Sequence, residues 1–170
     1  MTKTSETERE IHRKIAAACF NRAWDYLDAK KRSPEEEMKM LLLAHTSRYH
    51  WELVGSPANK AVGDWQLSRV YASIGDGDLA IRFAVSALAS CRRHHLSEFT
   101  PSAFEGVARA YAVARDSVKA ERYLARAREE LGKAELDNED RKIYLAQIRD
   151  TQRLLKRLSV QDCSGSHQPK

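Results

Sequence analysis

Several signatures of common enzyme classes are missing from this sequence of 170 residues. It has no glycine-rich phosphate loop, no HExxH metal motif, no CxxC pair and no GxSxG nucleophile turn. Each of these motifs places amides, metal ligands or a nucleophile where a reaction needs them. Their absence leads us to expect a protein that is not an enzyme and that uses neither a cofactor nor a metal.

Residues that interrupt helices are also scarce, because the chain has only 7 glycines and 4 prolines. Alanine, leucine, arginine and glutamate are abundant instead, and these residues favour helix. No apolar run approaches the ~18 residues that a membrane span needs. The first residues, MTKTSETERE, lack the basic and then apolar order of a signal peptide. We therefore expect an all-α protein with no membrane segment.

Cysteine and net charge are low as well. The three cysteines, Cys19, Cys91 and Cys163, are odd in number and far apart, which is typical of reduced thiols in a cytoplasmic protein. A formal net charge of +5 is too small for a dedicated nucleic-acid surface. The basic last helix also carries Asp140 and Asp150, and no helix-turn-helix pattern is present. Nucleic acid is therefore not expected as a partner.

Apolar residues at helical spacing predict seven helices in one domain over residues 10–158. Ser33-Pro34, Ser56-Pro57 and Thr100-Pro101 combine an N-cap residue with proline at the first helical position, and each predicts a helix start. Residues 1–9 are expected to form a frayed lead-in and residues 159–170 a disordered tail. The helices are expected at about 10–31, 34–54, 57–74 and 101–115, with others starting near Asp76 or Asp78, Asp116 and Asp137.

One pattern occurs twice between Asp64 and Glu130, with a separation of forty residues. Five of six compared pairs keep their chemical character, whereas Gly75 is replaced by Arg115. Short turns inside each helix pair require antiparallel neighbours, and stacked pairs bury the stripe that one pair alone leaves exposed. The six pairs are Leu67/Val107, Tyr71/Tyr111, Gly75/Arg115, Ala80/Ala120, Phe83/Tyr123 and Ala87/Ala127.

The duplicated pattern resembles the tetratricopeptide repeat. Residues 65–75 read WxLSxxYxxxG, with small residues Ala80 and Ala87 on the following helix. The spacing of forty exceeds the usual ~34, and Lys31 stands where the first pair would need the tyrosine. Residues 44–75 also resemble small bacterial repeat proteins, a likeness that implies no activity. The resemblance implies a superhelical stack of three antiparallel hairpins with a C-terminal capping helix.

In that repeat family the first helix of each hairpin lines a concave groove. By its register, the resemblance implies a partner-binding groove along these first helices. Helical spacing independently places Arg22 with Asp25, Trp65 with Arg69, and Glu105 with Arg109 on shared helix faces. Two arginines beside a tryptophan suit a carboxylate or an acidic peptide, because guanidinium binds carboxylate through two parallel hydrogen bonds. The groove residues expected are Arg22, Asp25, Trp65, Arg69, Glu105 and Arg109, with Val62, Ala72 and Ser102 beside them.

A structural alternative exists for the same residues. Arg69 can pair with a groove carboxylate such as Asp25, Arg22 can pair with that same carboxylate, and Arg109 can pair with Glu105 as plain salt bridges. The run from His45 to Trp51 also has a structural interpretation. His45 and His50 lie about 140° apart around the helix, so they cannot chelate one metal together. His45 and Arg48 are expected to satisfy the junction with the next helix.

The sequence thus predicts a cytoplasmic, non-catalytic adaptor that binds a protein or peptide in its groove. The alternative is a homo-oligomerising structural or regulatory helical domain of a bacterial signalling or transcription system, with the apolar residues of the first or last helix docking a second copy as a homodimer.

Overall fold

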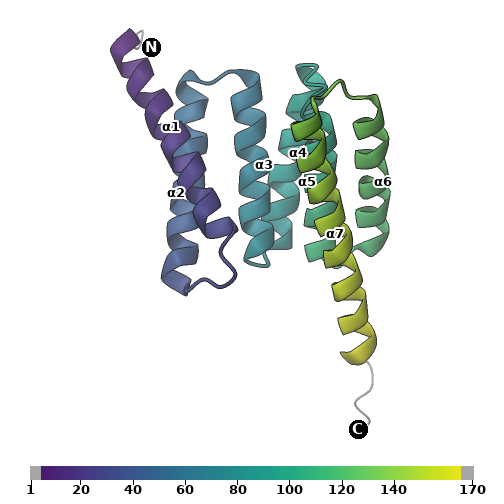
Figure 1. The fold of residues 1–170 in the computed structure, drawn as a ribbon. Coiled ribbons are helices and arrows are strands. Elements are labelled where there is room, and N and C mark those ends of the chain that lie inside the picture. The colour runs from purple at the N-terminus through teal and green to yellow at the C-terminus, as the bar shows by residue number, and fades with distance from the viewer. Residues whose placement is uncertain (1–4, 166–170) are drawn as a thin grey trace.

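Seven helices and no strand make up residues 5–165, the part of the chain that the computed structural model describes, with side chains described to Leu158. The protein is therefore all-α, as expected. Three antiparallel hairpins stand side by side in chain order, and the last helix crosses the face of the third (Figure 1). The helices are α1 Glu6–Leu27, α2 Pro34–Val54, α3 Pro57–Ser73, α4 Gly77–Arg93, α5 Thr100–Val113, α6 Ser117–Lys133 and α7 Asn138–Gly165.

Side-chain caps explain where most of these helices begin. Ser33 and Ser56 each accept a hydrogen bond from the backbone three residues on, as the Ser-Pro pattern predicts. Asp76 and Asp116 cap α4 and α6 in the same way. The Thr100-Pro101 prediction is only partly right. Thr100 lies inside the first turn of α5, and its hydroxyl donates to the Leu96 carbonyl instead of capping the helix.

Both ends of the chain are more helical than expected. Ser5 and Glu8 form a reciprocal capping box, so α1 begins at Glu6, inside the segment expected to be a frayed lead-in. At the other end, α7 continues to Gly165, because adding residues to an existing helix costs far less than starting one. Residues 159–165 are thus helical rather than part of a tail. Residues 1–4 and 166–170 lie outside the described part of the chain.

The two later hairpins reproduce each other at the predicted separation. Tyr71 stacks on Phe83 with ring centroids 5.5 Å apart, and Tyr111 stacks on Tyr123 at 5.6 Å. The bounds of α4 and α6 are also displaced by forty residues at both ends. The duplication seen in the sequence is therefore present in the packing.

Gly75 and Arg115, the repeat pair whose residues differ in chemical character, have the same type of backbone conformation. Gly75 has φ of 85° and Arg115 has φ of 63°, so both turn the chain through the left-handed region. That region is free of strain only for glycine. The substitution of glycine by arginine therefore changes the side chain without changing the turn.

We expect Gly75→Ala to lower the free energy of unfolding by about 1–2 kcal/mol, because a β-carbon is strained at this φ. A β-carbon at Gly75 would meet no atom within 4 Å, so the loss is conformational and not steric. The matched control is Gly132→Ala, which is equally open but lies inside α6. That change should raise stability by up to about 1 kcal/mol in urea denaturation. Equal effects of the two substitutions would contradict this explanation.

The core falls into two clusters. The larger joins α3, α4, α5, α6 and α7 and includes Phe104, Val107 and Ile148. The smaller joins α1, α2 and α3 around Met40 and Leu67. Tyr71 packs against both clusters. Helix α1 contacts α3, and helix α7 contacts α5. A site can therefore form between α1 and α7, over α3 and α5.

Candidate functional site

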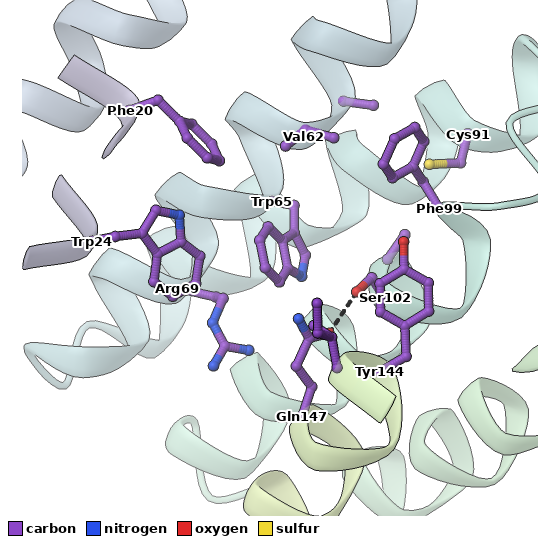
Figure 2. Close-up of a pocket in the computed structure, with 13 residues that line it drawn as sticks. Phe20, Trp24, Val62, Trp65, Arg69, Cys91, Phe99, Ser102, Tyr144 and Gln147 are labelled. Carbon is purple, nitrogen blue, oxygen red and sulfur yellow. Dashed lines mark hydrogen bonds between the residues drawn. The ribbon is translucent and has the colours of Figure 1, made fainter. Parts of the chain in front are cut away.

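A cavity of about 350 Å³ lies between α1, α3, α5 and α7. Figure 2 shows Phe20, Trp24 and Arg69 toward one end and Cys91, Phe99 and Tyr144 toward the other, with Trp65 and Val62 between them. Five of the thirteen lining residues are aromatic and most of the others are apolar, so the cavity suits an apolar guest. Its lining consists of Phe20, Trp24, Ala61, Val62, Trp65, Arg69, Cys91, Phe99, Ser102, Ala103, Ile143, Tyr144 and Gln147.

Trp65 is fixed at the centre of the cavity by its contact with α5. A β-carbon on Gly106 would lie only 2.9 Å from Cδ1 of the Trp65 ring, so glycine permits this close approach. On the other side, the Trp24 ring centroid is 5.7 Å from that of Trp65. Arg69 is on the same face as Trp65, one helical turn later. Its guanidinium carbon lies 5.2 Å from the Trp65 centroid and 5.7 Å from the Trp24 centroid.

A buried charge network adjoins the cavity. The Glu105 side chain is completely buried and accepts hydrogen bonds from Arg69 at 3.1 Å and from Arg109 at 3.2 Å. Thr151 of α7 also donates to Glu105, and Arg109 donates to Asp150 of α7. Two guanidinium groups and two carboxylates are thus gathered together. Charged groups that are buried in this way are retained only when they are paired.

The two arginines of this network differ in electrostatic environment. Burial lowers the pKa of Arg69 and the neighbouring charge of Arg109 adds to this, while the carboxylates of Glu105 and Asp150 offset only part of the effect. Burial also acts to lower the pKa of Arg109, but Glu105 and Asp150 together overcome it, so the pKa of Arg109 is raised. Arg109 is therefore the better compensated cation.

The cavity wall offers no activated nucleophile among the described residues. Burial raises the pKa of the Cys91 thiol to about 11 and that of Tyr144 to about 12. Both side chains are therefore protonated near neutral pH, where the thiolate is the reactive form of cysteine. Ser102 lies at the wall with its hydroxyl donating to Gln147 at 2.5 Å, and no histidine lines the cavity.

The structure separates the six residues that the sequence predicts for the groove. Trp65 and Arg69 line the cavity, whereas Glu105 and Arg109 lie in the adjoining network against α7. Arg22 and Asp25 are exposed on α1. Arg22 lines a different, shallow hollow between α1 and α2. Val62 and Ser102 do line the cavity, but Ala72 is not among its lining residues.

The alternative ion pairs are partly right. Arg109 pairs with Glu105 as expected. Arg69 also pairs with a groove carboxylate, but this is Glu105 and not Asp25. The reason is geometric, since Glu105 projects from α5 directly beside α3. Asp25, in contrast, is exposed on α1.

The His45–Trp51 run acts in packing between helices. His45 Nε2 forms a hydrogen bond with the Tyr71 hydroxyl at 2.8 Å, and Arg48 donates to Asp64 at 2.5 Å, so both satisfy the junction with α3 as expected. His50 lies against His12 of α1, with their Nδ1 atoms 2.6 Å apart. The described residues contain no group of three or more potential metal ligands.

Sequence reasoning missed what α7 and α1 contribute to the site. Gln147, Asp150 and Thr151 come from a helix that we expected to cap the stack or to dock a second copy, and Phe20 and Trp24 were not among the residues expected in the groove. The apolar spacing along α1 and α7 could be read from the sequence. The rotation of each helix about its axis, which decides which side chains face the cavity, could not. Phe99 lies in a loop, where no periodic pattern signals burial.

No protein-family model matches the chain, and no curated protein or solved structure matches it either. In the described part of the chain, no helix has both the length and the apolar character needed to cross a bilayer.

Proposed function

We propose that this protein is a non-catalytic adaptor that binds a protein or peptide at the cavity between α1 and α7. The observation that supports the proposal is the aromatic cavity of about 350 Å³ left beside Trp65. Buried aromatic walls and an arginine are typical of the central contacts of binding interfaces. The repeated aromatic stacks at forty-residue separation support a tetratricopeptide-like arrangement for the hairpins that frame it.

Helix α7 restricts how a partner can bind. It lies across α5 in Figure 1, and its Asp150 and Thr151 engage Arg109 and Glu105. A long peptide lying along all three first helices would have to displace these buried contacts. We therefore propose that the partner inserts one large apolar side chain into the cavity and contacts the exposed rims of α1 and α7 around it.

A charge placed on the rim should block this insertion. Ile143 lines the cavity and is 52% exposed, so Ile143→Glu should leave the fold intact. Peptides selected from a random displayed library against the parent protein should bind this variant at least tenfold more weakly, as expected for a central interface contact. Their dissociation constants are measured by calorimetry.

Leu145→Glu is the matched control, because Leu145 is also exposed on α7 but lies outside the cavity lining. It should bind the selected peptides as the parent does. Equal binding by both variants, or a library that gives no binder to the parent, would contradict the proposed site.

Self-association is a second candidate function, and an exposed apolar stripe on α2 favours it. Met38, Leu42, Tyr49 and Leu53 follow one another at intervals of four, seven and four residues, which places them on one helix face. Their exposed fractions range from 46% to 62%. This stripe lies on neither α1 nor α7, the two helices whose apolar residues are predicted from the sequence to dock a second copy.

If α2 docks a second copy, light scattering should give a dimer mass that falls to the monomer mass in the double variant Leu42→Glu, Tyr49→Glu, because charge at the centre of an apolar interface is not compensated. Val118→Glu is the control, since Val118 is 78% exposed on α6. A parent protein that is monomeric at every concentration would end this candidate.

A further inference from the structure

Two arginines at equivalent positions of successive hairpins are unequally paired. Arg109 bonds to Glu105 and Asp150 through different nitrogens. Arg69 bonds only through Nη1, to the same Glu105. Among the described residues, Nε and Nη2 of Arg69 have no hydrogen-bond partner. These two nitrogens are the kind of donor pair that holds both oxygens of a carboxylate.

Arg69 is also held in place before any ligand arrives. Its guanidinium lies close to the rings of Trp24 and Trp65, and its side chain is only 14% exposed. Figure 2 shows this side chain beside the two indoles at one end of the cavity. A donor pair that is already oriented loses little conformational entropy when it binds a ligand. Burial lowers the pKa of Arg69, so an additional carboxylate would supply compensation that the chain itself leaves incomplete.

The rest of the cavity favours a small, ring-bearing ligand. Trp65, Val62, Phe99 and Tyr144 provide apolar walls beyond the guanidinium. A volume of about 350 Å³ is at the lower end of the range for small-molecule sites, which is roughly 300–1,000 Å³. Beyond the cavity, α7 covers the adjoining part of α5 with Asp150 and Thr151. A ligand that extended from the cavity along α5 would therefore meet these contacts.

We propose that the cavity is a binding site for a small organic acid that carries an aromatic ring and one carboxylate. The ring packs between Trp65 and the far aromatic walls, and the carboxylate accepts hydrogen bonds from Nε and Nη2 of Arg69. This inference goes beyond the proposed adaptor function and does not depend on it. A bound acid and an inserted partner side chain would compete for the same space.

The test uses the full chain, labelled with ¹⁵N, and two acids with their uncharged primary amides. 3-Phenylpropionate and indole-3-acetate are titrated against 3-phenylpropionamide and indole-3-acetamide, which have nearly the same shape. The indole N–H signals of Trp24 and Trp65 should shift, while that of Trp51, which is not in the cavity lining, should not. Each acid should bind at least tenfold more tightly than its amide, because hydrogen bonds to a charged group are the stronger ones.

Arg69→Gln should remove this preference, leaving acid and amide within about twofold of each other. Arg69→Lys should retain part of it, since lysine keeps the charge but not the paired donors. Arg92→Gln is the matched control. Arg92 also lies over an aromatic ring, with its guanidinium carbon 5.3 Å from the centroid of Phe104, and it is outside the cavity lining. This variant should bind the acids as the parent does, and circular dichroism checks that all variants are folded.

Three results would overturn the inference. Amides that bind the parent as tightly as acids would show that Arg69 does not read the carboxylate. Acids that shift neither cavity tryptophan at millimolar concentration would show that the cavity does not take them. A short peptide ending in phenylalanine with a free carboxylate that binds over tenfold more tightly than 3-phenylpropionate would identify a chain end as the occupant. Failure of the adaptor proposal is recognised separately, from the binding of peptides that are selected against the parent protein and then tested on Ile143→Glu.

Discussion

Glu105→Ala should lower the free energy of unfolding by about 3–5 kcal/mol, because it leaves buried cations without their shared carboxylate. The Glu105 side chain is fully buried and accepts hydrogen bonds from Arg69, Arg109 and Thr151. Asp150 would remain to pair with Arg109, but among the described residues Arg69 would keep only its contacts with the Trp24 and Trp65 rings and no ion-pair partner. Urea denaturation followed by circular dichroism measures the loss.

Glu129→Ala is the appropriate control for this prediction. Glu129 forms ion pairs with Arg126 and Lys133 on the exposed face of α6, where such pairs contribute at most about 1 kcal/mol. A loss below about 1 kcal/mol for Glu105→Ala would mean that solvent or rearranged side chains compensate the arginines, and the buried network would then not hold α7 in place.

Phe104→Ala should have a comparable effect through a different mechanism. Phe104 is 3% exposed in the larger core cluster, with its ring centroid 6.2 Å from that of Tyr123. The guanidinium groups of Arg92 and Arg126 cover its ring. Truncating a buried phenylalanine removes its transfer free energy and leaves a cavity, which together cost about 3–5 kcal/mol.

The melting temperature and the urea midpoint should both fall in this variant. Val118→Ala removes apolar atoms from a residue that is 78% exposed and should change stability by no more than about 0.5 kcal/mol. If Phe104→Ala were as mild as this control, the hairpin formed by α5 and α6 would not depend on its central aromatic residue, and the assigned core would be wrong.

Much of the fold could be predicted because its signals are local. Ser33, Ser56, Asp76 and Asp116 mark helix starts through hydrogen bonds to residues three positions away, so the sequence contains both partners. The duplication could be predicted because stacked pairs such as Tyr71 and Phe83 must recur wherever the hairpin recurs. Helix ends were predicted less accurately, since α1 begins at Glu6 and not near residue 10.

The site was harder to predict because it depends on how helices rotate about their own axes. The register taken from the resemblance placed Trp65 and Arg69 of α3 on one face, and both line the cavity, but Glu105 and Arg109 of α5 lie outside its lining. It failed on α1, where Arg22 and Asp25 are exposed, and the repeat position held by tyrosine in the later hairpins falls on Lys31, beyond the end of the helix at Leu27. The pairing of Asp150 with Arg109 joins residues on helices whose contact no local pattern specifies.

The division of the core into two clusters has a consequence for how a guest enters. The helix that carries Phe20 and Trp24 belongs with Met40 and Ala23 in the smaller cluster, whereas Phe99 and Tyr144 belong with the larger one. Separate cores open with separate free energies. Local opening of the hairpin formed by α1 and α2 would therefore expose the end of the cavity that Phe20 and Trp24 line. The amide protons of α5 and α6 would stay protected from exchange.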